Sequence, residues 1–113
     1  MSSDRERLWL RDIIDYSDDV RGFLEGMSFE QMCSDRKTVA AIERCLQCIT
    51  EAAIRIGDVR MTVIAPDIPL HALRGLGNQL RHAYDAIDVR TIYDTVVDDL
   101  PPLRAACLAA LEQ

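Results

Sequence analysis

Long apolar runs are absent from this 113-residue sequence, and none of its segments has the length needed to cross a bilayer. The first seven residues also lack the apolar stretch of a secretory signal peptide, so we expect a cytoplasmic protein with no membrane partner. The sequence has no internal repeat, no low-complexity tract and no alternating strand pattern. These absences leave a helical globular protein as the expected class.

Paired metal-ligand motifs are also missing. Of the four cysteines, Cys45 and Cys48 form a single CxxC, and no second CxxC or histidine pair is spaced to complete a zinc site. With Ala41 and Ala52 these two cysteines make a stripe of small residues at helical spacing. We therefore interpret them as packing residues at a close helix contact and expect no metal and no cofactor.

The composition is that of an ordinary globular chain, with 49% apolar and 28% charged residues. Its length predicts one domain covering residues 1–113. The net charge of −6 argues against broad electrostatic binding of nucleic acid. Any contact with RNA would have to be made by a local basic pocket.

Apolar periodicity predicts helices joined by short connections. In residues 4–26, apolar side chains recur every three or four positions, and Gly26 then ends the helix. Ser28 to Gln31 has the form of a capping box, which indicates one short helical turn. A second long helix is expected from the N-cap Asp35 to Gly57.

The second half of the sequence predicts two more helical regions. Residues 58–67 are partly β-branched and are expected to form a connecting loop, because one unpaired strand would be unstable. A third helix is expected to open at residues 67–69 and a further helix at Asp88, with a kink or break at Pro101 and Pro102. The expected fold is an all-α, antiparallel bundle of four to five helices.

The third helix carries the most informative cluster of the chain. Because successive helical residues are rotated by about 100°, Arg74, Asn78, Arg81 and His82 share one polar face, with His71 on the same half and Tyr84 beside it. Leu73, Leu76 and Leu80 lie on the opposite side. A solvated face usually carries glutamate and lysine, whereas guanidinium, imidazole and carboxamide groups are those that bind a phosphodiester and move its protons. The residues alone leave a functional face and a merely solvated face equally open.

A resemblance decides between them. From Asp4 to about Leu103 the chain resembles the HepT-like branch of the HEPN superfamily, whose members are toxins of HepT–MntA type VII toxin–antitoxin pairs. The similarity is carried by order and spacing across several segments, which are residues 10–14, 23–29, 39–46, 51–53, 66–69, 78–84 and 87–88.

The resemblance implies a dimer in which the polar faces of two third helices meet in a composite cleft. It also implies a metal-independent endoribonuclease in which the ribose 2′-hydroxyl attacks the adjacent phosphate. His82 would act as general acid or base, Asn78 would orient the phosphate or the imidazole, and Arg74 and His71 would contact substrate. Tyr84 matches the tyrosine that a partner MntA-like nucleotidyltransferase antitoxin modifies with AMP, which would block the cleft with bulk and negative charge.

The chain departs from the family at one position. The family pattern is Arg, any four residues, His, any residue, Tyr, and Gly77 stands where that Arg is expected. Arg81 is our preferred substitute, since it lies one turn after Gly77 on the same stripe. Arg74, roughly 12 Å from His82 along the helix axis, suits a flanking phosphate better.

Three hypotheses for the function of this chain remain open. The first is an active ribonuclease toxin with RNA as substrate, neutralised by its antitoxin and forming a homodimer, with higher assembly left open. The second is a catalytically weak or silent dimer that binds RNA or the partner. The third is a helical scaffold without an active site.

Overall fold

Helices make up all the regular structure in the computed structural model, which describes residues 3–82 and 88–113. The predicted all-α class is therefore confirmed for these ranges. None of the helices found there is long and apolar enough to cross a membrane. In chain order the elements are α1 (Asp4–Leu24), α2 (Phe29–Ser34), α3 (Arg36–Ile56), α4 (Asp58–Ile64), α5 (Leu70–His82), α6 (Val89–Asp94), the π-helical η1 (Thr95–Asp99) and α7 (Leu100–Leu111).

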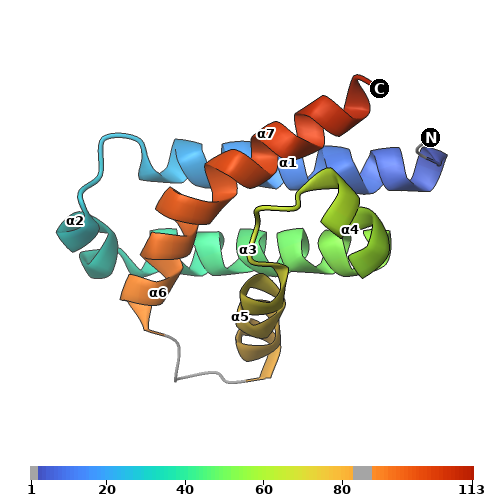
Figure 1. The fold of residues 1–113 in the computed structure, drawn as a ribbon. Coiled ribbons are helices and arrows are strands. Elements are labelled where there is room, and N and C mark those ends of the chain that lie inside the picture. The colour runs from blue at the N-terminus through green and yellow to red at the C-terminus, as the bar shows by residue number, and fades with distance from the viewer. Residues whose placement is uncertain (1–2, 83–87) are drawn as a thin grey trace.

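Two long helices, α1 and α3, form the backbone of the bundle. They run side by side in opposite directions, and α7 packs across α1 (Figure 1). The predicted ends of α3 are confirmed, because the Asp35 side chain accepts a hydrogen bond from the backbone N–H of Thr38 and Gly57 takes a positive φ of 93°. The predicted capping box at Ser28 and Gln31 is also present and opens α2.

The core lies between these helices and draws side chains from most of them. Each buried aliphatic side chain contributes roughly 1.5–3 kcal/mol relative to an exposed one. The largest side chains with almost no exposure are Leu10, Ile13, Met32, Ile42, Leu46, Ile49, Met61, Ile92 and Leu103. The long pair therefore provides a fixed surface on which the shorter helices dock.

The loop predicted for residues 58–67 is wrong over its first part, because Asp58–Ile64 forms the helix α4. Its β-branched residues Val59 and Val63 point to solvent, whereas Met61 is buried in the core. The weak helix propensity of valine, a few tenths of a kcal/mol, is outweighed by this tertiary packing. The β-branched residues favoured a strand or a loop, so the short helix α4 was not predicted from the sequence.

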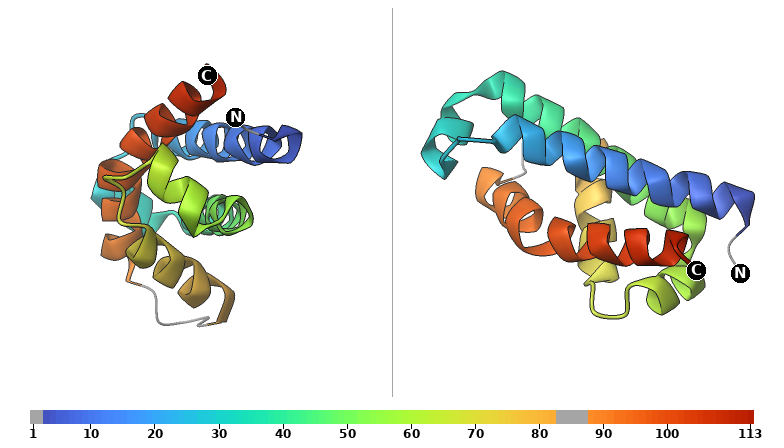
Figure 2. Two further views of the ribbon diagram at one scale, coloured as in Figure 1. Left: turned by 45° about the vertical axis from the view of Figure 1, so that its right-hand side comes forward. Right: turned by 90° about the horizontal axis from the view of Figure 1, so that it is seen from above.

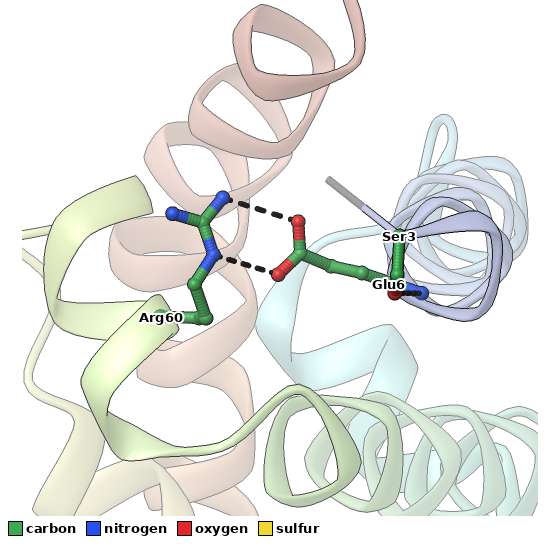
Figure 3. Close-up of polar contacts among 3 residues, drawn as sticks. All are labelled: Ser3, Glu6 and Arg60. Carbon is green, nitrogen blue, oxygen red and sulfur yellow. Dashed lines mark hydrogen bonds and ion pairs between the residues drawn. The ribbon is translucent and has the colours of Figure 1, made fainter. Parts of the chain in front are cut away.

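An ion pair holds α4 to the start of α1 (Figure 3). The Arg60 guanidinium donates from Nε to Glu6 Oε1 at 2.8 Å and from Nη2 to Oε2 at 3.1 Å. The Glu6 side chain is only 7% exposed, and the carboxylate raises the pKa of Arg60. Such a two-point contact to a buried carboxylate fixes both the position and the orientation of α4 relative to the start of α1.

Replacing Arg60 by alanine is expected to lower the free energy of unfolding by about 1–3 kcal/mol, because the buried Glu6 carboxylate loses two charge-assisted hydrogen bonds. The matched control is Arg74→Ala, which removes a more exposed pair and should cost less than about 1 kcal/mol. Urea unfolding of both variants tests this. Equal losses would show that burial of Glu6 does not matter.

The C-terminal helical region runs from α6 through η1 into α7 with a change of hydrogen-bond register. Pro101 and Pro102 lie in the first turn of α7 and have no backbone N–H to donate. Just before them the N–H of Leu100 donates to the carbonyl of Thr95, five residues back, as in a π-helix. The predicted start of a helix at Asp88 is confirmed, since Asp88 is the N-cap of α6 and its side chain accepts a hydrogen bond from Arg90 N–H.

Candidate active site

Helix α5 extends away from the long pair (Figure 1). It carries the predicted site residues other than Tyr84, and its last residue is His82. Leu73 and Leu76 bury its apolar face, and α5 contacts α3 and α4. Leu73 N–H donates to the carbonyl of Pro69 at 3.0 Å, which ties the first turn to the preceding proline. The opposite face, with His71, Asn78 and His82, is exposed as predicted.

Gly77 faces α3 rather than the polar face. A Cβ atom added there would lie 2.4 Å from Thr50 Oγ1 and 2.7 Å from Thr50 Cβ, far inside normal contact distance. Thr50 is almost fully buried, and its hydroxyl donates to the carbonyl of Gln47 at 2.9 Å. An arginine at position 77 is therefore incompatible with the present spacing of α3 and α5. The sequence indicated that a side chain was missing here but not that Thr50 occupies its place.

Arg81 and Asn78 are brought together on α5. Arg81 Nη2 donates a hydrogen bond to Asn78 Oδ1, one turn earlier on the helix. The Arg81 side chain is half-buried, whereas Asn78 and His82 are exposed. The guanidinium is thus restrained beside the helix face that ends at His82. Its remaining N–H groups can still bind an anion.

Arg74 forms an ion pair with Asp58, which was not predicted from the sequence. Its Nη1 donates to Asp58 Oδ2 at 3.0 Å, and its Nη2 donates to Asp58 Oδ1. The two side chains are 41% and 66% exposed, so water and salt weaken this ion pair. Arg74 can therefore exchange Asp58 for another anion, but it is not free in this state.

The two histidines are both exposed and lie on nearly the same line of α5, about 16 Å apart along its axis by helical rise. The side chain of His82 makes no hydrogen bond to another residue of the described ranges. The predicted modification site Tyr84 lies outside the described residues.

A large hollow of the described surface is not at this cluster. It measures about 860 Å³, lies between the C-terminal half of α1 and the start of α7, and includes Ser17, Arg21, Leu100 and Arg104. None of the predicted site residues lines it. The predicted site residues and this hollow are therefore separate, and the geometry of α5 defines the candidate site.

Comparison with known proteins places these features in a family. The model of the family described as "Ribonuclease HepT-like" matches residues 13–110. A protein of Thermococcus cleftensis named "Probable ribonuclease HepT" is 33% identical over 97 residues, covering 85% of this chain and 86% of its own length. One of Methanocaldococcus jannaschii, named "Putative RNase MJ1216", is 31% identical over 99 residues, covering 87% of this chain and 80% of its own length. The chain described here belongs to the HepT-like ribonuclease family.

Proposed function

We propose that this chain is a HepT-like toxin that cleaves RNA without a metal ion, with His82 as acid or base and Arg81 as the stabiliser of the phosphate. Family membership supports ribonuclease activity in general. The observation that carries the specific proposal is the hydrogen bond from Arg81 to Asn78, next to the exposed His82. It supplies a restrained guanidinium on a chain that cannot accept one at position 77.

The reaction needs only proton transfer and charge stabilisation. The ribose 2′-oxygen attacks phosphorus, the 5′-oxygen leaves, and a 2′,3′-cyclic phosphate remains. His82 takes the proton of the 2′-hydroxyl or gives one to the departing 5′-oxygen. The guanidinium of Arg81 donates to the non-bridging oxygens, where negative charge builds up.

A homodimer would complete this site. One imidazole cannot act as base and acid at the same moment, whereas a two-fold axis beside α5 would bring two of them to one phosphate. In that arrangement Arg74 and His71 bind flanking phosphates, with RNA displacing Asp58 from Arg74. Sedimentation of the purified chain at micromolar concentration tests this, and a monomer that still cleaves RNA contradicts it.

The proposal is tested by RNA cleavage in the presence of a chelator. Wild type should cleave, and Arg81→Ala should lower kcat by about 10²-fold, since removing one preorganised donor to a transition-state oxyanion has an effect of that size. The control Arg74→Ala should raise KM and leave kcat within a few-fold. Wild type that does not cleave, although intact-mass measurement shows an unmodified chain, refutes the nuclease.

A partner protein could control cleavage by modifying a residue close to His82. We propose that a nucleotidyltransferase antitoxin transfers AMP to Tyr84, two residues after His82, and so adds bulk and negative charge next to the imidazole. Incubation with such an enzyme and ATP should add one nucleotidyl group and abolish cleavage. A Tyr84→Phe chain should remain active under the same treatment.

A second candidate is a silent member of the family that binds RNA or the antitoxin without cleaving. It is favoured by one observation, the packing of Gly77 against Thr50, which excludes the family's arginine. The two candidates differ in one result. The silent protein binds RNA with the same affinity whether or not residue 82 is histidine, and it releases no product.

A further inference from the structure

Helix α5 extends from the bundle on the same side as the helical arm formed by α6 and η1 (Figure 2). A small groove is lined by residues of α5 and of this arm. Its volume is about 260 Å³. Pockets that enclose drug-sized ligands measure about 300–1,000 Å³, so this groove suits a single ring system. Its lining residues are Ala72, Leu73, Gly75, Leu76 and Gln79 on one side and Thr91, Thr95 and Asp99 on the other.

The groove lies next to His82 by helix geometry. Gln79 precedes His82 by one turn and is rotated from it by about 60°, and Gly75 precedes it by two turns on nearly the same line. The groove therefore continues the face of α5 that ends at the imidazole. A nucleotide whose phosphate lies at His82 can place its base, or that of its neighbour, in this space.

The lining combines an apolar floor with a polar rim. Ala72, Leu73 and Leu76 offer a surface for the face of an aromatic ring, and Gly75 leaves room above the helix. On the opposite wall the Thr95 hydroxyl already donates to the carbonyl of Thr91 at 2.9 Å. Asp99 has no side-chain hydrogen bond within the described chain.

Asp99 gives the groove a preference for ligands that donate hydrogen bonds. It ends the π-helical η1, and such turns are common at functional sites. Burial and the charge of the neighbouring Asp98 raise the pKa of Asp99, as expected for a carboxylate short of donors. An ionised carboxylate only accepts hydrogen bonds, and it can accept two at once.

We propose that this groove binds a guanine base of the RNA substrate. Guanine has two adjacent donors, N1–H and N2–H, on its Watson–Crick edge, whereas the other bases present one donor beside an acceptor. Asp99 would accept both, the ring would lie on the Leu76 side of the floor, and the Gln79 amide would donate to O6. This inference rests on the proposed function, because it makes the groove the base-selecting part of the same RNA site.

The test is titration of the purified full-length chain with guanosine and inosine 5′-monophosphates, which differ only in the N2 amino group. Wild type should bind the guanosine nucleotide, and the inosine nucleotide about 10-fold more weakly, because one charge-assisted hydrogen bond is lost. Asp99→Asn should remove this preference. The matched control Asp98→Asn, with the same change of charge one residue away, should keep it.

A second variant blocks the groove without disturbing the fold. A Cβ at Gly75 meets no atom within 4 Å, so Gly75→Leu can enter the groove, and leucine also favours the helix. It should weaken guanosine monophosphate binding at least 10-fold. The control is Gly22→Leu in α1, which is equally unobstructed but far from the groove along the chain.

The outcomes separate this inference from the proposed nuclease. Equal binding of the two nucleotides, no binding of either, or full binding by Gly75→Leu overturns the guanine site, even if the chain cleaves RNA. Guanosine-selective binding by a chain that never cleaves RNA keeps the site and refutes the catalytic proposal. In an active chain, cleavage should be faster beside guanosine than beside inosine.

Discussion

Replacing His82 by alanine is expected to lower metal-free RNA cleavage by roughly 10²–10⁴-fold, the range that general acid–base groups contribute. The imidazole is exposed at the end of α5 and has no hydrogen bond within the described ranges, so its removal leaves the core untouched. The free energy of unfolding should change by less than about 0.5 kcal/mol. The measurement is single-turnover cleavage in a chelator, with unfolding followed in parallel.

His71 provides the matched control for this prediction. It is the other histidine of the chain, lies on the same helix and is also exposed. His71→Ala should retain kcat within about 10-fold, because we assign it only to contact with substrate away from the scissile bond. An equal loss of kcat in the two variants would contradict these roles, because it would not distinguish His82 from His71 as the group that transfers the proton.

Replacing Gly77 by alanine is expected to destabilise the protein by about 1–3 kcal/mol, even though alanine is the better helix former. The new methyl group would lie 2.7 Å from Thr50 Cβ, which is fixed to the backbone of α3 and cannot rotate away. The helices must therefore separate. Gly77→Arg, which restores the family's residue, should destabilise the protein more than Gly77→Ala and should not increase cleavage.

The dependence on Thr50 makes this prediction specific. In a Thr50→Gly background the obstructing atoms are gone, so Gly77→Ala should become neutral or stabilising by up to about 1 kcal/mol. The resulting coupling free energy is measurable by a double-mutant cycle in urea. Gly75→Ala is the control, since a Cβ there meets nothing within 4 Å. If Gly77→Ala is as stable as Gly75→Ala, the contact with Thr50 is not as described.

Much of the fold follows from sequence periodicity and capping residues. Asp35 and Gly57 marked the ends of α3 because N-caps and positive-φ glycines act locally. The failure at α4 has a tertiary cause, since Met61 in the core and the Arg60–Glu6 ion pair stabilise a helix that its own valines do not favour. Local patterns carry no information about a partner 54 positions away.

The candidate site was also predictable only in part. Its exposed face, and the approach of Arg81 to Asn78 at a three-residue spacing, follow from the geometry of a single helix. Two features depend on other helices and were missed. These are the ion pair of Arg74 with Asp58 on α4 and the packing of Gly77 against Thr50 on α3. The second explains why the guanidinium has to come from another position.

The most direct test uses two oligonucleotides that differ by one oxygen atom. In a chelator, wild type should cleave an RNA oligonucleotide and leave a 2′,3′-cyclic phosphate, and it should not cleave the same strand with 2′-deoxyribose at the scissile position. Cleavage of both strands, or a product without the cyclic phosphate, would contradict attack by the 2′-hydroxyl. Cleavage of neither by an unmodified chain would contradict the existence of an active site at His82.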